Sequence, residues 1–130
     1  MLNQKIMKQL IILLICLLSS SLVFSQEAIS KEDSPEKRAA YITDQMVEKL
    51  ELDINLKDTF YALNLKYANI IQKEIIDQDL SLFSQYHKGM KINKKKEEEL
   101  LPLLSEKQKE LYQSLKKENS KKFLAKLFGF

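Results

Sequence analysis

Apolar positions recur at helical spacing through most of the chain, beginning near residue 35. Ser34–Glu36 has the residues preferred at a helix start: a Ser for the N-cap, Pro35 for the first helical position, and an acid in the first turn. The pattern therefore predicts a first helix from Pro35 to about Glu51. Its apolar stripe repeats every three or four residues, at Ala39, Ile42, Met46 and Leu50.

The segment Leu52-Asp53-Ile54-Asn55-Leu56 interrupts this pattern and starts a second helix, in which Asp53 or Asn55 can accept the first free backbone N–H groups. The second helix is predicted to run from about Leu56 into the seventies. It carries two adjacent apolar stripes: Leu56, Phe60, Leu63, Tyr67 and Ile70, and beside them Tyr61, Leu65, Ala68 and Ile75. One neighbouring helix needs only one stripe. This helix is therefore either central in the domain or packed against a second chain as well.

The pattern loosens between Asp77 and Gly89, which predicts a kink or hinge near Gly89. The run of three Lys and three Glu at Lys94–Glu99 resumes the helix. We interpret this run as a solvated helix face with i,i+3 ion pairs, and we expect Pro102 to end the helix.

A capping box is predicted at the start of the last helix, at Ser105-Glu106-Lys107-Gln108. Ser105 can accept the Gln108 N–H, while the Gln108 side chain can accept the Ser105 N–H. The apolar residues of this helix are Leu111, Tyr112, Leu115, Phe123, Leu124, Leu127 and Phe128. The sequence thus predicts an all-α fold of about four helices in a single domain, 34–130, after a flexible leader, 26–33.

The first 25 residues have the pattern of a secretory signal peptide. Lys5 and Lys8 precede an unbroken apolar run at Leu10–Leu18, and cleavage is predicted after Ser25. The apolar run is about half the roughly 20 residues that a membrane span needs; an uncleaved anchor is the alternative. Cys16 lies inside the run, so the mature chain would contain no Cys for a disulfide, a thiol enzyme or a Cys-based metal site.

The charges are nearly balanced. Without Lys5 and Lys8 the basic residues number 19 against 18 acidic ones, a net charge of +1, which gives no argument for a nucleic-acid partner. The last segment, Lys121–Phe130, is basic and amphipathic. It can lie on an anionic membrane surface, although docking on the domain or on a second copy is the favoured interpretation.

Residues suited to catalysis are scarce, because the chain has one His, His87, and no Trp. His87 lies near Met90, a combination of ligands that suits copper or nickel, but no second His completes the set, and an exposed or packed His is the favoured alternative. No Gly-rich phosphate loop or Ser–His–Asp arrangement is found. We therefore expect no enzymatic activity and no cofactor.

The phrase Leu104-Ser105-Glu106-Lys107-Gln108 resembles the L-T-x-x-Q motif of the Spy/CpxP-like periplasmic proteins, with Ser105 in place of Thr. An earlier, degenerate copy lies 52 residues upstream at Leu52–Leu56, where Asp53 stands for Thr and Leu56 for Gln. Asp53 keeps the cap, whereas Leu56 loses the amide. The resemblance covers about 35–120.

This resemblance implies a four-helix fold that forms a cradle-shaped antiparallel homodimer in the periplasm. Known members include ATP-independent chaperones and envelope-stress modulators, and related proteins sense or buffer metal. The partners would be unfolded or partner proteins. A metal-binding accessory and a peripheral membrane protein remain alternatives. The residues that we take as candidates for client binding are Met46, Phe60, Tyr61, Tyr67, Phe83, Tyr86 and Met90.

Overall fold

We describe the fold from a computed structural model, which covers residues 4–9 and 32–128, with side chains up to Lys121. The predicted apolar run at 10–18, the cleavage site after Ser25, most of the leader, and the side chains of 122–130 lie outside the described residues. Residues 4–9 form a short helix, and the described part contains no strand. The long helices are α2 (Pro35–Lys49), α3 (Lys57–Ile71), α4 (Leu82–Leu100) and α5 (Glu106–Phe128).

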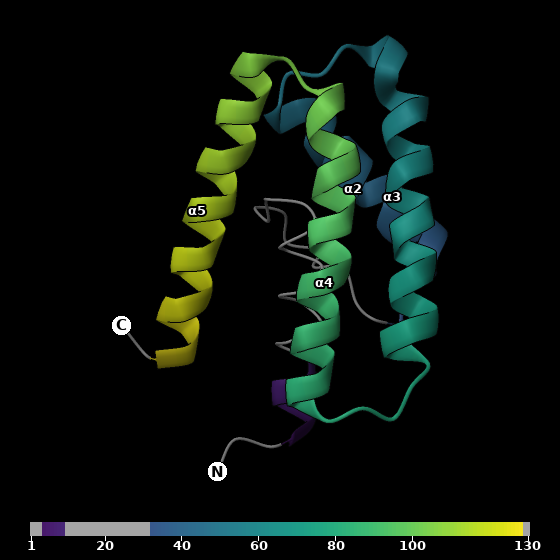
Figure 1. Cartoon of the computed structure of the whole chain (residues 1–130), viewed down its shortest axis with the longest axis vertical. Coiled ribbons are helices and arrows are strands. Elements are labelled where there is room, and N and C mark those ends of the chain that lie inside the picture. Colours follow the sequence, from purple (N-terminus) through teal and green to yellow (C-terminus); the bar gives the residue numbers. More distant parts are fainter. Residues whose placement is uncertain (1–3, 10–31, 129–130) are drawn as a thin grey trace.

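The helices form antiparallel hairpins (Figure 1). α3 and α4 run side by side in opposite directions, α2 lies behind them, and α5 runs back along the other side of α4 while diverging from it. Short turns join them: a 3₁₀ turn, η1 (Ile54–Leu56), before α3; a π turn, η2 (Gln72–Ile76), after it; and a 3₁₀ turn, η3 (Leu101–Leu103), before α5. The all-α prediction is confirmed.

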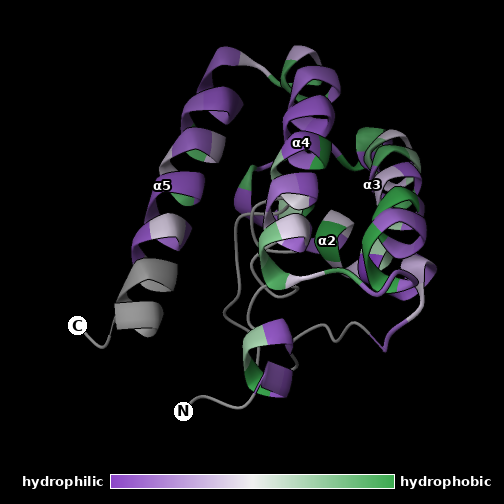
Figure 2. Ribbon diagram, turned by 60° about the horizontal axis from the view of Figure 1, so that its bottom comes forward, coloured by the Kyte–Doolittle hydropathy of each residue, from purple (hydrophilic) through white to green (hydrophobic). Residues whose placement is uncertain are grey.

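α3 is the central helix of the domain. It packs against α2 on one side and α4 on the other, and its buried residues include Phe60, Leu63 and Tyr67. The helix is thus central in the domain, although Leu56 of the first stripe is exposed and Tyr61 and Leu65 of the second are half-buried. Figure 2 shows the contrast with α5, whose described residues are mainly hydrophilic. One core cluster joins all four long helices: Ile42, Met46, Leu50, Leu52, Phe60, Leu63, Tyr67, Ile71, Ile75, Ile92, Leu100, Leu104 and Tyr112.

Side-chain caps start the helices. Ser34 Oγ accepts the Lys37 N–H at 3.1 Å, as predicted. Asp53 accepts the Asn55 N–H at 2.9 Å and so caps the 3₁₀ turn that leads into α3. The capping box is also present: Gln108 N–H donates to Ser105 Oγ at 3.2 Å, and Ser105 N–H donates to Gln108 Oε1 at 2.9 Å. A further cap, Ser81 at the start of α4, was not predicted.

The predicted kink near Gly89 is wrong. α4 continues without interruption from Leu82 to Leu100, with Gly89 buried inside it. The chain breaks earlier, at 77–81, where α3 has ended through its π turn and Ser81 caps the next helix. Asp and Ser compete locally for backbone hydrogen bonds, and this preference ends the helix more effectively than a single packed Gly.

The charge run Lys94–Glu99 is not a uniformly solvated face. Lys96 is 3% exposed. Glu97 meets Lys116 of α5 at 2.6 Å, and Glu99 meets Lys66 of α3 at 2.7 Å. Six successive residues of an α-helix point in all directions around its axis, so a continuous run must also face the neighbouring helices. These charges therefore connect α4 with α3 and α5.

The two motif-like segments lie side by side at one end of the hairpins. Leu52 and Leu104 are both buried in the core cluster. Gln108 connects the segments, because its Nε2 donates to the Glu51 carbonyl at 3.4 Å while its Oε1 accepts the Ser105 N–H. Lys107 also pairs with the Glu51 carboxylate at 2.9 Å. This end of the domain is thereby held together by both segments.

Glu51 adopts a left-handed backbone conformation, with φ at 53°. It follows the last residues of α2, and the Leu52 N–H bonds back to the Val47 carbonyl at 3.1 Å. This is the hydrogen bond of a Schellman-type helix end, a place where Gly is the usual residue because it lacks a Cβ. Glu51 therefore holds a strained conformation.

Replacing Glu51 by Gly is expected to stabilise the domain by about 0.5–1 kcal/mol, because the relief of the left-handed strain exceeds the added chain entropy. Chemical denaturation measures the free energy of unfolding. Glu51→Gln is the matched control: it keeps the Cβ and removes only the exposed pair with Lys107, so we expect little change. A Gly variant no more stable than the Gln variant would contradict the strain argument.

Candidate binding surface on α4

A row of large side chains lies on the outer surface of α4. Phe83 is 74% exposed, Tyr86 40% and Met90 43%. Their spacing of three and four residues places them on one helix face. His87 lies among them, with its ring centroid 4.2 Å from that of Phe83 and 5.8 Å from that of Tyr86, both in edge-to-face geometry. We call Phe83, Tyr86, His87 and Met90 the α4 row.

The structure separates the candidates for client binding into two groups. Met46, Phe60 and Tyr67 are at most 3% exposed and belong to the core. Tyr61 is half-buried. Phe83, Tyr86 and Met90 reach the surface together as part of the α4 row. Periodicity alone gave no means of separating these groups, because core stripes and surface stripes have the same spacing.

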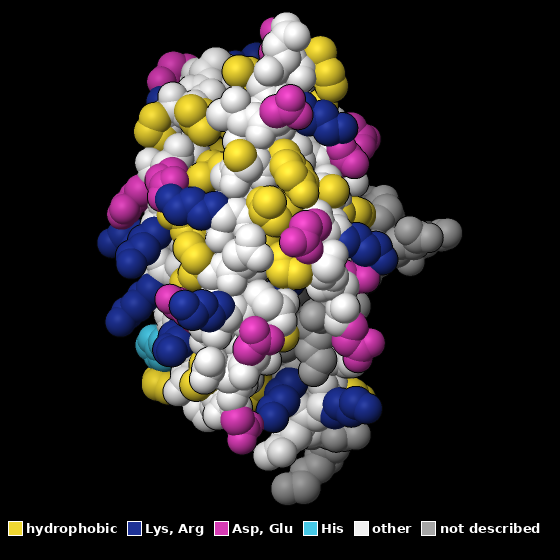
Figure 3. Space-filling model, turned by 90° about the vertical axis from the view of Figure 1, so that its right-hand side faces the viewer, with side chains coloured by type: hydrophobic (Ala, Val, Ile, Leu, Met, Phe, Trp, Pro, Cys, Tyr) yellow, Lys and Arg dark blue, Asp and Glu magenta, His cyan; other side chains and the backbone are white. Residues whose placement is uncertain are grey.

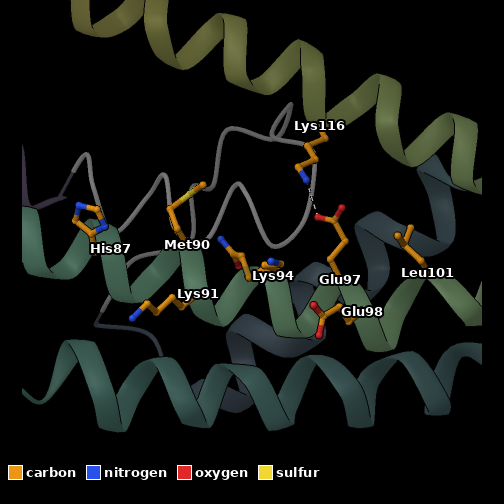
Figure 4. Close-up of a pocket in the computed structure, with 9 residues that line it drawn as sticks. His87, Met90, Lys91, Lys94, Glu97, Glu98, Leu101 and Lys116 are labelled. Carbon is orange, nitrogen blue, oxygen red and sulfur yellow. Dashed lines mark hydrogen bonds and ion pairs between the residues drawn. The ribbon is translucent and has the colours of Figure 1, made fainter.

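A groove of about 520 Å³ lies between α4 and α5 (Figure 4). It begins at His87 and Met90 of the α4 row, so the row and the groove are continuous. Lys116 reaches down from α5 to Glu97 of α4 at 2.6 Å, and this ion pair spans the groove. The other residues that line the groove are Lys91, Asn93, Lys94, Glu98 and Leu101.

Asn93 is a residue that the sequence analysis did not single out. It is 8% exposed and lines the groove. Neither its amide nitrogen nor its amide oxygen has a hydrogen-bond partner among the described residues. One feature of the sequence could have indicated that Asn93 is buried. It follows Ile92 and lies on the side of α4 that also carries Gly89, Lys96 and Leu100.

Exposed lysines surround the row and the groove: Lys88, Lys91, Lys94 and Lys95. A second hollow, of about 440 Å³, lies where these lysines face the end of α3, with Glu74 and Glu98 in its lining. Figure 3 shows dark blue Lys and Arg side chains along the left edge of the molecule, with the single His, in cyan, beside them. This side of α4 therefore combines apolar side chains with positive charge.

Two tyrosines connect α4 to its neighbours through carboxylates. The Tyr67 hydroxyl donates to Glu99 at 2.6 Å, and the Tyr112 hydroxyl donates to Glu97 at 3.5 Å. Burial, followed by the hydrogen bond to Glu99, raises the pKa of Tyr67 to about 12. Burial and the Glu97 charge raise the pKa of Tyr112. Hydrogen bonds from Lys66 and then from Tyr67 lower the pKa of Glu99. These groups hold helices together and stay in one protonation state near neutral pH.

Among the described residues, no group of three or more His, Cys, Asp or Glu residues is placed to hold a metal ion. His87, the weak metal candidate, lies against the rings of Phe83 and Tyr86. No helix among the described residues is both long and apolar enough to cross a membrane. The side chains of the basic C-terminal segment, 122–130, are not described.

Comparison with known proteins gives one match. The model of a family described as a domain of unknown function, DUF4890, matches residues 25–126. No curated protein and no solved structure matches the chain. The match covers α2, α3 and α4 and most of α5, and so includes the α4 row and the groove.

The stability of the domain is expected to fall as the pH rises from about 10 to about 12, because the folded protein retains the Tyr67 proton that the unfolded chain loses near its usual pKa of 10.0. The contribution of Tyr67 is fully present below pH 10 and is lost as the pH passes the raised pKa. Tyr67→Phe should make this fall in the free energy of unfolding smaller and leave the part that the raised pKa of Tyr112 contributes. Tyr61→Phe, on the same helix, is the control; an equal flattening in both variants would contradict the assignment.

Proposed function

The chain belongs to the DUF4890 family, a domain of unknown function, and we propose that it is an exported helical module that binds other proteins. It would act as an ATP-independent chaperone or as a modulator of envelope stress in the periplasm. The location is carried by the predicted signal peptide at 1–25, and the activity class by the resemblance of Leu104–Gln108 to the motif of the Spy/CpxP-like proteins.

The observation that carries the proposal is the α4 row. Phe83, Tyr86 and Met90 lie outside the core cluster, which includes other large apolar side chains of α3 and α4, among them Phe60, Ile92 and Leu100. Grouped exposed apolar side chains usually mark an interaction site. Met adds a flexible, polarisable surface that suits varied partners. The surrounding lysines add long-range attraction without fixing a single geometry, so contacts with an unfolded client can be weak and can rearrange.

The proposal includes a homodimer of antiparallel, cradle-like form. α5 remains helical to Phe128 while it diverges from α4 (Figure 1). A helix gains most of its stability in proteins from packing on a neighbour, and a second copy of the chain would supply that neighbour. The double stripe on α3 does not contribute to this argument, because α3 already packs against α2 and α4 of its own chain.

Suppression of aggregation tests the chaperone activity. The protein should keep a thermally or chemically unfolded client soluble without ATP, measured by light scattering. Replacing Phe83, Tyr86 and Met90 together by Gln, a good helix former, should raise the amount of protein needed by roughly tenfold, because the contact area of three side chains is lost. Circular dichroism checks that the variant stays helical.

The matched control replaces three other exposed apolar residues by Gln: Ile54, Leu56 and Leu103, which are 66%, 40% and 41% exposed and lie in η1 and η3. This variant should protect the client as well as the unchanged protein does. An equal loss of client protection in both variants would contradict a special role of the α4 row in client binding. No protection by the unchanged protein at several-fold molar excess would exclude the chaperone activity.

The oligomeric state is tested by light scattering after size exclusion. We expect a stable dimer, because α5 leaves the hairpins of its own chain. A monomer at every concentration measured would exclude the cradle-shaped dimer. The aggregation assay would then decide separately whether a single chain binds clients through the α4 row.

A further inference from the structure

The groove between α4 and α5 contains a buried amide without a partner. Asn93 is 8% exposed, and neither its Nδ2 donor nor its Oδ1 acceptor is paired among the described residues. Buried polar groups left unpaired destabilise a fold, and nearly all of them in native proteins are satisfied. Within the described part of the chain, single atoms of Arg38, Asn64 and Gln85 are also buried without a partner, but in Asn93 both amide atoms are, and this residue lies in the lining of the groove.

We propose that this groove binds an extended, acidic segment of another polypeptide, with one peptide group of the segment paired to the Asn93 amide. The inference rests on the proposed protein-binding function. It goes further by naming the site, the group that is recognised and the charge of the preferred segment.

The chemistry of Asn93 favours a peptide group over a simple anion. A side-chain amide offers a donor and an acceptor in one plane, and a backbone peptide group offers the complementary C=O and N–H. A carboxylate presents only acceptors near neutral pH, so it would satisfy Nδ2 and leave Oδ1 unpaired. Recognition of backbone is also independent of side chains, which suits a protein that binds varied clients.

The charges along the groove favour an acidic segment. Lys91 and Lys94 line the groove from α4, and Lys116 lines it from α5. The Glu97 carboxylate forms an ion pair with Lys116 at 2.6 Å. The other acidic residue in the lining is Glu98. Acidic side chains on either side of the paired peptide group would therefore meet positive charge.

The dimensions fit a short stretch of chain. The volume of about 520 Å³ lies within the range of known ligand pockets. Along α4, the distance from His87 to Glu97 is about 15 Å at the usual helical rise, which corresponds to about four residues of extended chain. Met90 and Leu101 offer apolar contacts for alternate side chains. A client that leaves the groove at Met90 passes directly onto the α4 row.

The test uses the purified protein and a fluorescein-labelled peptide, Glu-Leu-Glu-Leu-Glu-Leu, with blocked ends, followed by fluorescence anisotropy. Asn93→Leu should weaken binding about tenfold, as expected for the loss of buried hydrogen bonds. The thermal midpoint should stay the same or rise, because Leu has the same branched skeleton as Asn and removes the unpaired amide. Asn69→Leu, at an exposed position of α3, is the matched control and should leave the affinity unchanged.

Two further peptides test the two parts of the inference on the unchanged protein, so they do not depend on whether a variant folds. A peptide of the same sequence with N-methylated backbone amides keeps its charges and loses its N–H donors; it should bind about tenfold more weakly. A Lys-Leu repeat should bind more weakly than the Glu-Leu repeat at low salt. Equal binding of the N-methylated peptide would overturn the pairing with Asn93, and equal binding of the Lys-Leu repeat would overturn the acidic preference.

The outcomes separate this inference from the proposed function. Peptide binding that depends on Asn93, without suppression of aggregation, would support the groove and exclude the chaperone activity. Suppression of aggregation that is unchanged in Asn93→Leu, together with unchanged peptide affinity, would overturn the groove and leave the α4 row as the binding surface. A dimer that Asn93→Leu converts to a monomer would assign the groove to a second copy of the chain and would also overturn the inference.

Discussion

The packing of α3 between α2 and α4 is the constraint that shapes this domain. The sequence has a single Cys, so no internal disulfide can stabilise it, and the core must come from helix packing. α2 covers one side of α3 and α4 covers the other. α4 therefore presents its inner side, with Ile92 and Leu100, to the core. Its outer side, with Phe83, Tyr86 and Met90, is not needed for the fold and remains exposed.

Buried polar groups fix how α2 lies on α3. The Asn64 amide donates to Thr43 Oγ1 at 2.9 Å and approaches the Met46 sulfur at 3.4 Å, while Thr43 donates to the Ala39 carbonyl at 2.7 Å. Arg38 donates to Gln72 Oε1 at 2.7 Å, at the π turn that follows α3. Sliding α2 along α3 would break these bonds and leave their groups buried without partners, so the polar contacts select one register.

Asn93 differs from these buried polar residues. Asn64, Thr43 and Arg38 each bond to a group within the domain, whereas neither amide atom of Asn93 does so among the described residues. A Leu at this position would serve the fold at least as well. The contrast between amides in similar surroundings therefore distinguishes a residue that supports the fold from one that we assign to a ligand.

The features that were predictable from the sequence are those set by neighbours along the chain. The caps at Ser34, Asp53 and Ser105 depend on hydrogen bonds that span two or three residues. The sequence pattern identified Ser34 and Ser105 and left the choice between Asp53 and Asn55 open. The kink near Gly89, the solvated face at Lys94–Glu99 and the surface role of Phe60 depended instead on which helix packs against which. Periodicity gives the width of an apolar face but not its partner. The groove was unpredictable for the same reason.

The groove follows from how α5 is attached to the rest of the domain. At its start, Leu104 enters the core and Gln108 bonds to Ser105 and to the Glu51 carbonyl. One more attachment follows, where Tyr112 is buried and Lys116 pairs with Glu97. Beyond this point α5 diverges from α4, so the ion pair lies where the helices separate (Figure 4). In the proposed function, an arm attached mainly at its start would let the groove take clients of different bulk without disturbing the core around α3.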